Sequence, residues 1–262
     1  MLPQLHSVTK LQPAGHHEDV DPALVESIAI CSGLKAFDCL DGFVWIYERP
    51  DLSEVFKLTQ LTELGAWFSW NFLPELCRMT LLEHLHLDVD LDDDCSLDQA
   101  LSSMPHLQTV RIKFSGAIWR DDEGWLPGKL RLSGDAFSEL HHLRTLLLDG
   151  VDIDESFFLV LTSKTGLTKL EFTSLRHSNF ARDLMCEVNL LRNLEELTLR
   201  LYEEEYTVGD LLKPERLLKL KHLNISGNED EVEAVRKKFD QSMHPALVNK
   251  EKSPWRSRSV FP

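Results

Sequence analysis

Histidine and aspartate side chains alternate along one short segment of the chain. His84, His86 and Asp88 are each separated by one residue, so in a β-strand all three project from the same face. Histidines at this spacing can bind zinc when a further strong ligand comes from a neighbouring strand. The residues expected beside them include Arg111 and Lys113, and cations are poor neighbours for a metal ion. We therefore expect an exposed polar strand face here and no metal site.

The remaining reactive residues also lack the pattern of an active site. The acidic run from Asp88 to Asp94 lacks the glycine and the final glutamate of a calcium-binding loop, since Gln99 stands at the twelfth position. No phosphate-binding, zinc-protease or hydrolase signature occurs. Cys77 and Cys186 lie on apolar helix faces and are expected in the core. The sequence therefore predicts no enzyme and no cofactor.

One phrase recurs along the chain: an apolar residue, two variable residues, an apolar residue, one variable residue and a last apolar residue. Apolar side chains two residues apart point the same way from a strand, so each copy predicts a short strand with one buried face. Most copies follow one another at the roughly 20–29 residue period of a solenoid. The copies begin at Leu34, Leu61, Leu82, Leu107, Leu143, Leu167, Leu194 and Leu220.

Between these copies the apolar spacing changes to three or four residues, which is typical of a helix. Each repeat is therefore predicted to be one strand followed by one helix or helical turn. Stacked repeats of this kind form a parallel sheet on the concave side and helices on the convex side. The expected helices are 19–30, 52–58, 96–104, 154–161, 180–191, 208–220 and 229–240.

The repeats resemble intracellular leucine-rich repeats, above all the irregular ribonuclease-inhibitor-like type. The last copy carries the loop asparagine of that family, in the run Leu220-Lys221-His222-Leu223-Asn224-Ile225-Ser226-Gly227-Asn228. The resemblance covers about residues 30–242. It implies an α/β fold, a right-handed leucine-rich-repeat solenoid or horseshoe of about eight to nine repeats. It also implies a protein-binding role, as in the F-box ubiquitin-ligase adaptors and the nucleotide-binding innate immune receptors.

The domain prediction is a single solenoid over residues 1–242, with a flexible basic tail over 243–262. Residues 1–33 are predicted to be a partial repeat or cap. Within them, residues 1–11 are predicted to be a weak ninth strand or cap, in which Leu5 and Val8 take the first two apolar positions of the phrase. Residues 229–242 are predicted to be the C-terminal capping helix. The long step between Leu107 and Leu143 predicts an insertion loop over 116–132. Its Trp119 and Trp125 either bind a partner or pack on the neighbouring repeat.

The variable residues of the strand phrase are predicted to line the concave sheet. Reading across the repeats gives two rows of chemically varied side chains, in contrast to the leucines behind them. Tryptophan and arginine are enriched among the residues that dominate binding energies. The alternative is an ordinary solvent-facing sheet. The candidate partner-binding residues on these rows are Trp67, His86, Asp88, Arg111, Lys113, Asp149, Glu171 and Arg200.

Charge and composition narrow the class of partner. The formal net charge of −15 would repel nucleic-acid phosphates, and no apolar run is long enough to span a membrane. Five scattered cysteines predict a reducing location, the cytoplasm, with the nucleus as an alternative. We expect a protein partner, no nucleic acid and no membrane, for a monomer or a part of a longer chain. Two functions stay open: concave-face recognition, or an acidic inhibitor or scaffold that occludes a basic protein.

Overall fold

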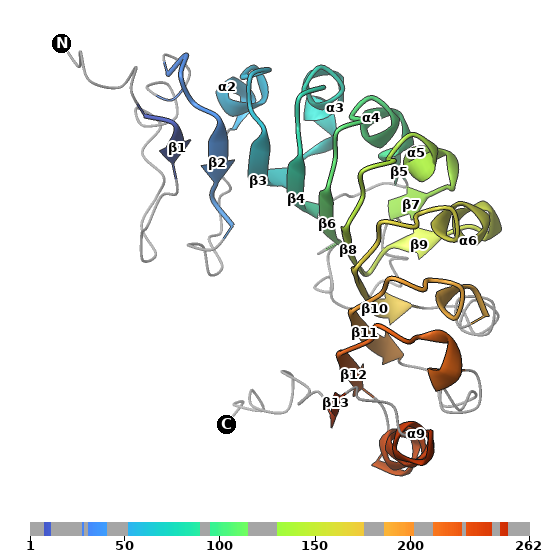
Figure 1. Cartoon of the computed structure of the whole chain (residues 1–262). Helices are drawn as coiled ribbons and strands as arrows, with labels where there is room; N and C mark the ends of the chain where they lie inside the picture. Colours follow the sequence, from blue (N-terminus) through green and yellow to red (C-terminus); the bar gives the residue numbers. More distant parts are fainter. Residues whose placement is uncertain are drawn as a thin grey trace, which may run out of the picture.

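The computed structural model describes residues 8–11, 28, 31–40, 52–89, 95–114, 130–175, 186–201, 212–226, 229–242 and 247–250. Ten parallel strands form one sheet that lines the inner side of an arc, and short helices lie on the outer side (Figure 1). This arrangement is the α/β leucine-rich-repeat solenoid that the sequence predicts. In sheet order the strands are β1 (Lys10–Leu11), β2 (Ala36–Asp38), β3 (Glu63–Phe68), β4 (His84–Val89), β6 (Thr109–Phe114), β8 (Thr145–Asp149), β10 (Lys169–Leu175), β11 (Glu196–Leu201), β12 (His222–Ser226) and β13 (Leu247–Lys250).

The outer side of the arc carries short helices and a second, small sheet. Strands β5 (Cys95–Ser96), β7 (Leu130–Leu132) and β9 (Asp152–Ile153) pair in parallel and form that sheet. The predicted insertion over 116–132 therefore extends too far, since its last three residues belong to a regular strand. The helices are α2 (Ser53–Phe56), η2 (Trp70–Phe72), α3 (Leu73–Leu76), α4 (Asp98–Ser102), α5 (Asp135–Ser138), α6 (Glu155–Leu161), η3 (Pro214–Arg216) and α9 (Glu229–Gln241).

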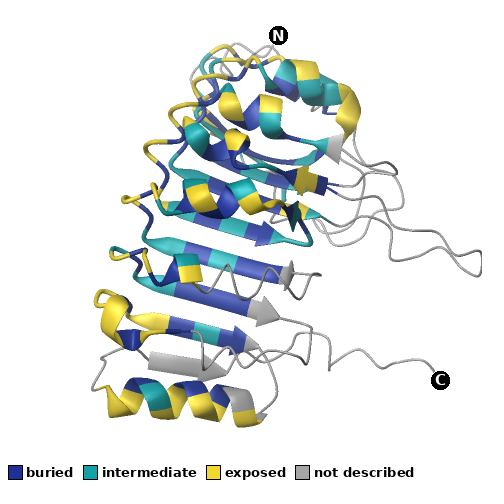
Figure 2. Cartoon of the chain, turned by 90° about the vertical axis from the view of Figure 1, so that its right-hand side faces the viewer, coloured by how far each residue is buried: buried dark blue, intermediate teal, exposed yellow. Residues whose placement is uncertain are grey.

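The apolar positions of the repeated phrase form the core between the sheet and the helices. Their side chains are buried in every repeat from β3 to β12, as Leu85 on β4 and Leu197 on β11 illustrate. Figure 2 shows these buried residues along the strands and the exposed turns along one edge. Alternation of direction along a strand sends the intervening residues to the opposite, concave face. The same pattern that builds the core thus exposes the candidate binding rows.

Backbone hydrogen bonds join each turn to the one before it. The carbonyl oxygen of Glu83 accepts two backbone N–H groups of the next repeat, from Gln108 at 2.7 Å and from Thr109 at 3.1 Å. The same double acceptance recurs at the equivalent residue of every repeat from Thr9 to Glu195. Residues that sequence alone aligned by their leucines are therefore aligned by hydrogen bonds as well.

Phenylalanines connect three consecutive repeats behind the centre of the sheet. Phe157 on α6 lies edge-on to Phe137 on α5, with ring centroids 5.0 Å apart. It also lies edge-on to Phe172 on β10, at 6.0 Å. All three rings are buried. The start of α6 is fixed by Asp154, whose carboxylate accepts the backbone N–H of Phe157 at 3.1 Å.

The two ends of the sheet differ from the sequence prediction. At the first strand, Leu11 pairs with Phe37, so Val8 and Leu11 take the first two apolar positions of the phrase. The sequence had aligned Leu5 and Val8 there, three residues earlier. At the other end, Leu247–Lys250 pairs with β12 as a tenth strand, within the segment predicted to be a flexible tail. Both errors arise because short edge strands carry little apolar pattern.

The two helical cysteines lie in different surroundings. Cys77 packs partly buried against the core, and burial raises the pKa of its thiol. Cys186 is exposed, so its predicted core position is wrong. Val188, two residues later on the same helical turn, is buried instead.

Lys164 is buried at a position that other repeats fill with leucine or methionine, such as Met104 and Leu140. Its ammonium donates to the backbone carbonyl of Ser138, at the end of α5, at 2.8 Å. Burial lowers the pKa of Lys164, and the nearby carboxylate of Glu139 partly offsets this effect. The aliphatic stem therefore replaces a leucine while the head group caps a helix terminus.

Two substitutions separate the contributions of the aliphatic stem and of the ammonium group of Lys164 to stability. We expect Lys164→Ala to lower the free energy of unfolding by about 2 kcal/mol or more, because buried aliphatic volume is lost. Lys164→Met keeps that volume and should lie within about 1 kcal/mol of the wild type at neutral pH, since the loss of the cap is offset by the removal of a buried charge. Urea unfolding of the three proteins measures both differences.

The pH dependence of the stability difference between the wild type and Lys164→Met tests the cost of burying the charge of Lys164. The folded-state pKa of Lys164 is below the unfolded value of about 10.4. The penalty for burying the ammonium is therefore complete at neutral pH and decreases as pH rises through the folded-state pKa. The wild type should gain stability relative to Lys164→Met in this alkaline range. A constant difference from neutral to alkaline pH would show that the burial of charge does not matter here.

Candidate partner-binding surface

The strand register places the concave side chains in three columns. The central column and the distal column, nearer the strand ends, are those that the sequence predicts, and the pairing of the strands confirms both alignments. The central column contains Asp38, Gly65, His86, Arg111, Leu147, Glu171, Thr198 and Asn224. The distal column contains Trp67, Asp88, Lys113, Asp149, Thr173, Arg200 and Ser226.

The middle of the central column combines a cation with an apolar residue. Arg111 is exposed and lies between His86 and Leu147, which are both half-buried. Its guanidinium makes no hydrogen bond or ion pair with other residues in the described part of the chain. Half-buried Glu171 follows on the next strand. An arginine beside an apolar side chain suits a partner that offers a carboxylate or carbonyl next to a hydrophobic group.

The distal column begins with a half-buried tryptophan. Trp67 pairs with Asp88 in the strand register, and the carboxylate of Asp88 lies 3.4 Å from the ammonium of Lys113. The Lys113 side chain keeps 49% of its surface exposed. An exposed ion pair of this kind contributes little stability, so it leaves the lysine available for a partner. Asp149 follows Lys113 on β8 and is half-buried.

Gly65 occupies the central column on β3, two residues before Trp67, and contributes no side chain there. A Cβ added to Gly65 would lie 2.2 Å from the carboxylate oxygen of Asp38. That same oxygen accepts the backbone N–H of Leu40 at 3.0 Å. The Asp38 side chain therefore lies across Gly65 and occupies the place of the missing side chain. The concave surface next to Trp67 is therefore formed by the Asp38 carboxylate instead of by a side chain of β3.

The concave face is less open over β10 and β11 than the sequence suggests. Thr173 and Thr198 are both buried, although they stand at positions expected to face solvent. The hydroxyl of Thr173 is buried without a hydrogen-bond partner. Buried polar atoms normally find a partner, so this hydroxyl is an exception within the concave face. The exposed part of the concave surface therefore centres on β3, β4, β6 and β8.

Three predicted contact residues have no described side chain. Arg200 has a described backbone, which pairs with Thr173 and Ser226, while its side chain lies outside the described residues. Trp119 and Trp125 also lie outside them. Their roles in binding stay predictions, as do those of Trp67, Arg111 and the other residues on the two columns.

Sequence reasoning placed His84 on the concave face but did not extend it into a proximal column along the strand starts. It is formed by the second variable residue of the phrase, which also projects from the concave face. The column carries ion pairs: Lys169 to Glu196 at 2.8 Å, and Lys10 to Glu63 at 3.3 Å. The latter pair spans β2, whose residue in this column is the small Ala36. Alternation along the strand was the signal that could have found this column.

The histidines on β4 lie where the sequence placed them. His84 and His86 share the concave face with Asp88, and the next strand contributes Arg111 and Lys113. Within the described ranges no group of three or more histidine, cysteine or acidic side chains is arranged to hold a metal ion. In the same ranges no helix has the length and apolar character needed to cross a membrane.

Solved structures similar to this chain include two bacterial proteins. An internalin from Listeria monocytogenes matches 88% of this chain and 78% of its own, at 15% identity and a TM-score of 0.40. A leucine-rich-repeat protein from Leptospira interrogans matches 88% and 71%, at 13% identity and a TM-score of 0.34. No protein-family model and no curated protein sequence matches the chain. The fold assignment therefore rests on the strand register described above.

Proposed function

We propose that this chain is a non-catalytic module that recognises a partner protein through its concave face. The observation that carries the proposal is the register of the sheet, which holds Trp67 on β3 and Arg111 and Lys113 on β6, with only β4 between the two strands. Strands in a sheet lie about 4.8 Å apart, so these side chains form one small, rigid surface. Such preorganisation lowers the entropic cost of binding, and tryptophan and arginine are the residues most enriched in binding hot spots.

A more specific role follows from the resemblance of the repeats to those of ubiquitin-ligase adaptors and innate immune receptors. We propose that the module selects the substrate or ligand of a larger assembly, either a ubiquitin-ligase adaptor or an innate immune sensor. The alternative of an acidic inhibitor finds no support in the described concave face, because that face carries cations and carboxylates side by side. The thiol of Cys39 is buried, with its pKa raised to about 12 by burial. A buried free thiol suits the reducing cytoplasm, which we propose as the location.

The experiment compares partner capture by three forms of the chain. The wild type is used as bait beside Trp67→Ala/Arg111→Ala, which alters the concave face. The matched control is Arg78→Ala/Leu159→Ala, which removes one arginine and one large apolar side chain that are exposed elsewhere. Circular dichroism and thermal melting establish that all three fold equally.

The expected result is a partner held by the wild type and the control and lost by the concave variant. Truncating two hot-spot residues should weaken the affinity at least about tenfold. Equal retention by all three forms would contradict the concave assignment and would direct the search to the helical side. The identity of a partner lost only by the concave variant then separates adaptor from sensor.

A further inference from the structure

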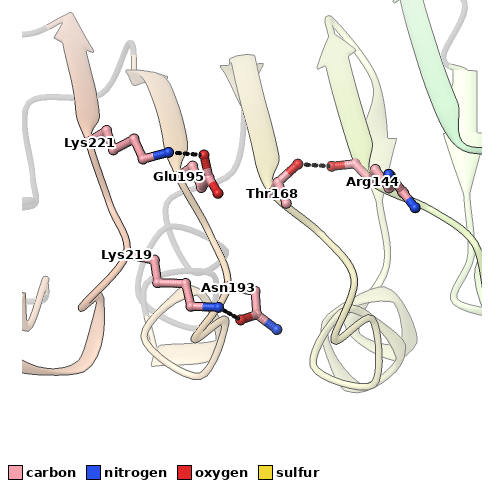
Figure 3. Close-up of polar contacts among 6 residues, drawn as sticks. All are labelled: Arg144, Thr168, Asn193, Glu195, Lys219 and Lys221. Atoms are coloured by element: carbon pink, nitrogen blue, oxygen red, sulfur yellow. Dashed lines mark hydrogen bonds and ion pairs between the residues drawn. The ribbon is translucent and has the colours of Figure 1, made fainter.

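Two neighbouring turns lead into β11 and β12 and are joined along their length. The Asn189 side chain accepts the backbone N–H of Lys213 at 2.7 Å. Further along, the Lys219 ammonium donates to the side-chain oxygen of Asn193 at 2.7 Å (Figure 3). Because these contacts lie at both ends, the two turns run side by side between them.

The outer surface of these two turns carries exposed leucines. Leu218 is 72% exposed and Leu190 is 46% exposed. A single exposed leucine is ordinary on a protein surface. Two large apolar side chains on adjoining turns provide a larger area that a partner could cover.

The same two turns are basic, in a chain whose net charge is −15. Their carboxylates are Glu215, which is exposed, and Glu187 and Glu195, which are half-buried. Glu195 is already engaged by Lys221 at 2.5 Å, a contact that lowers the pKa of Glu195 (Figure 3). We define the basic turn patch as the exposed side chains Leu190, Arg192, Lys213, Arg216, Leu218 and Lys219.

We propose that the basic turn patch binds an acidic segment of a protein, in which carboxylates are interspersed with apolar residues. Arg192 and Arg216 make no side-chain hydrogen bond or ion pair with the described residues, so both guanidinium groups can receive carboxylates in bidentate fashion. The two leucines would contact the apolar side chains of the segment. This surface lies along the turn edge and is separate from the concave columns, so the partner need not be the one recognised there.

The composition of the patch favours a protein over other anions. Nucleic acids are held by cations together with aromatic side chains that stack on bases, and the patch has leucines instead. An extended anionic surface such as a membrane would also meet the acidic remainder of the chain. Lys219 is held in place by Asn193, and a fixed cation matches a fixed carboxylate better than a fluid array of lipid headgroups.

The test measures binding by fluorescence anisotropy to the full chain. The probe is a short labelled peptide in which glutamates alternate with leucines, and a second peptide has glutamine in place of glutamate. Vesicles containing phosphatidylserine and a single-stranded RNA serve as competing anions. The patch variant is Arg192→Glu/Arg216→Glu, and its control is Arg78→Glu/Arg144→Glu, two exposed arginines on the turns of earlier repeats. Leu218→Ser is compared with Leu81→Ser, another exposed leucine on a turn.

We expect the acidic peptide to bind the wild type and both controls, with at least about tenfold weaker binding by Arg192→Glu/Arg216→Glu and several-fold weaker binding by Leu218→Ser. Affinity should fall as salt is added. Equal losses in the patch and control variants would overturn the proposal, because general electrostatics would then suffice. No binding of the acidic peptide, equal binding of the glutamine peptide, or preference for the vesicles or the RNA would overturn it as well.

Discussion

Replacing Phe157 by alanine is expected to lower the free energy of unfolding by about 3–5 kcal/mol. The ring is 1% exposed and contacts Phe137, Phe158 and Phe172 at centroid distances of 5.0, 5.8 and 6.0 Å. Alanine would leave a cavity that three aromatic neighbours line. Edge-to-face ring contacts contribute beyond the area they bury, so their loss adds to the cavity cost. The effect is large because one side chain joins α5, α6 and β10.

The measurement is urea unfolding followed by circular dichroism, with Leu159→Ala as the control. Leu159 lies on the same helix and is 73% exposed, so its truncation should change stability by no more than about 0.5 kcal/mol. Both substitutions remove a large apolar side chain from α6, and the comparison therefore isolates burial. Similar midpoints for the two variants would contradict the described packing of Phe157 between repeats.

Replacing Gly134 by alanine is expected to cost about 1–3 kcal/mol through overpacking. A Cβ at this position would lie 2.4 Å from the carbonyl oxygen of Ser156 and 2.6 Å from its carbon. The obstacle is backbone, so α5 must move away from the start of α6. That movement also weakens the hydrogen bond from the Gly134 N–H to the Ser156 hydroxyl, now 2.7 Å long. The glycine is thus required for the close approach of two repeats.

A second glycine provides the comparison. Gly166 is exposed in a turn, and its added Cβ would meet only the Leu143 carbonyl oxygen, at 3.4 Å. Gly166→Ala should therefore be neutral or slightly stabilising, because alanine restricts the unfolded chain. Thermal melting of the two variants would show the difference directly. A melting temperature for Gly134→Ala as high as that of Gly166→Ala would mean that the two helices are not in close contact.

The repeated leucines predicted most of this fold because strand and core obey the same spacing. Leu82, Leu85 and Leu87 specify a strand, its buried face and its register with the next repeat all at once. That spacing is weak where the apolar residues are few. The strand at Lys10–Leu11 was therefore displaced by three residues, and Leu247–Lys250 was missed.

The candidate surface was predicted in part for a related reason. Alternation along β3 to β6 placed Trp67, His86 and Arg111 on the concave face, and the strand pairing agrees. Burial of Thr173 and Thr198 was not foreseen, since a threonine at an outward position gives no sign of what covers it. The basic turn patch was missed because its cations come from two turns that are separated in the sequence. Only the fold places these turns side by side.

Each turn has a carbonyl that accepts two backbone N–H groups of the following repeat. The protection of these amides against hydrogen exchange therefore depends on the preceding repeat and not on the following one. At this edge the two amides of a repeat are protected by a carbonyl of the repeat before it, as those of Gln108 and Thr109 are by Glu83. Removing repeats from the C-terminal end leaves these protected amides unchanged in the repeats that remain. Removing repeats from the N-terminal end deprives the first remaining repeat of its acceptor. A shortened variant is therefore expected to lose protection of these turn amides when repeats are removed from its N-terminal side, and to keep it when they are removed from its C-terminal side.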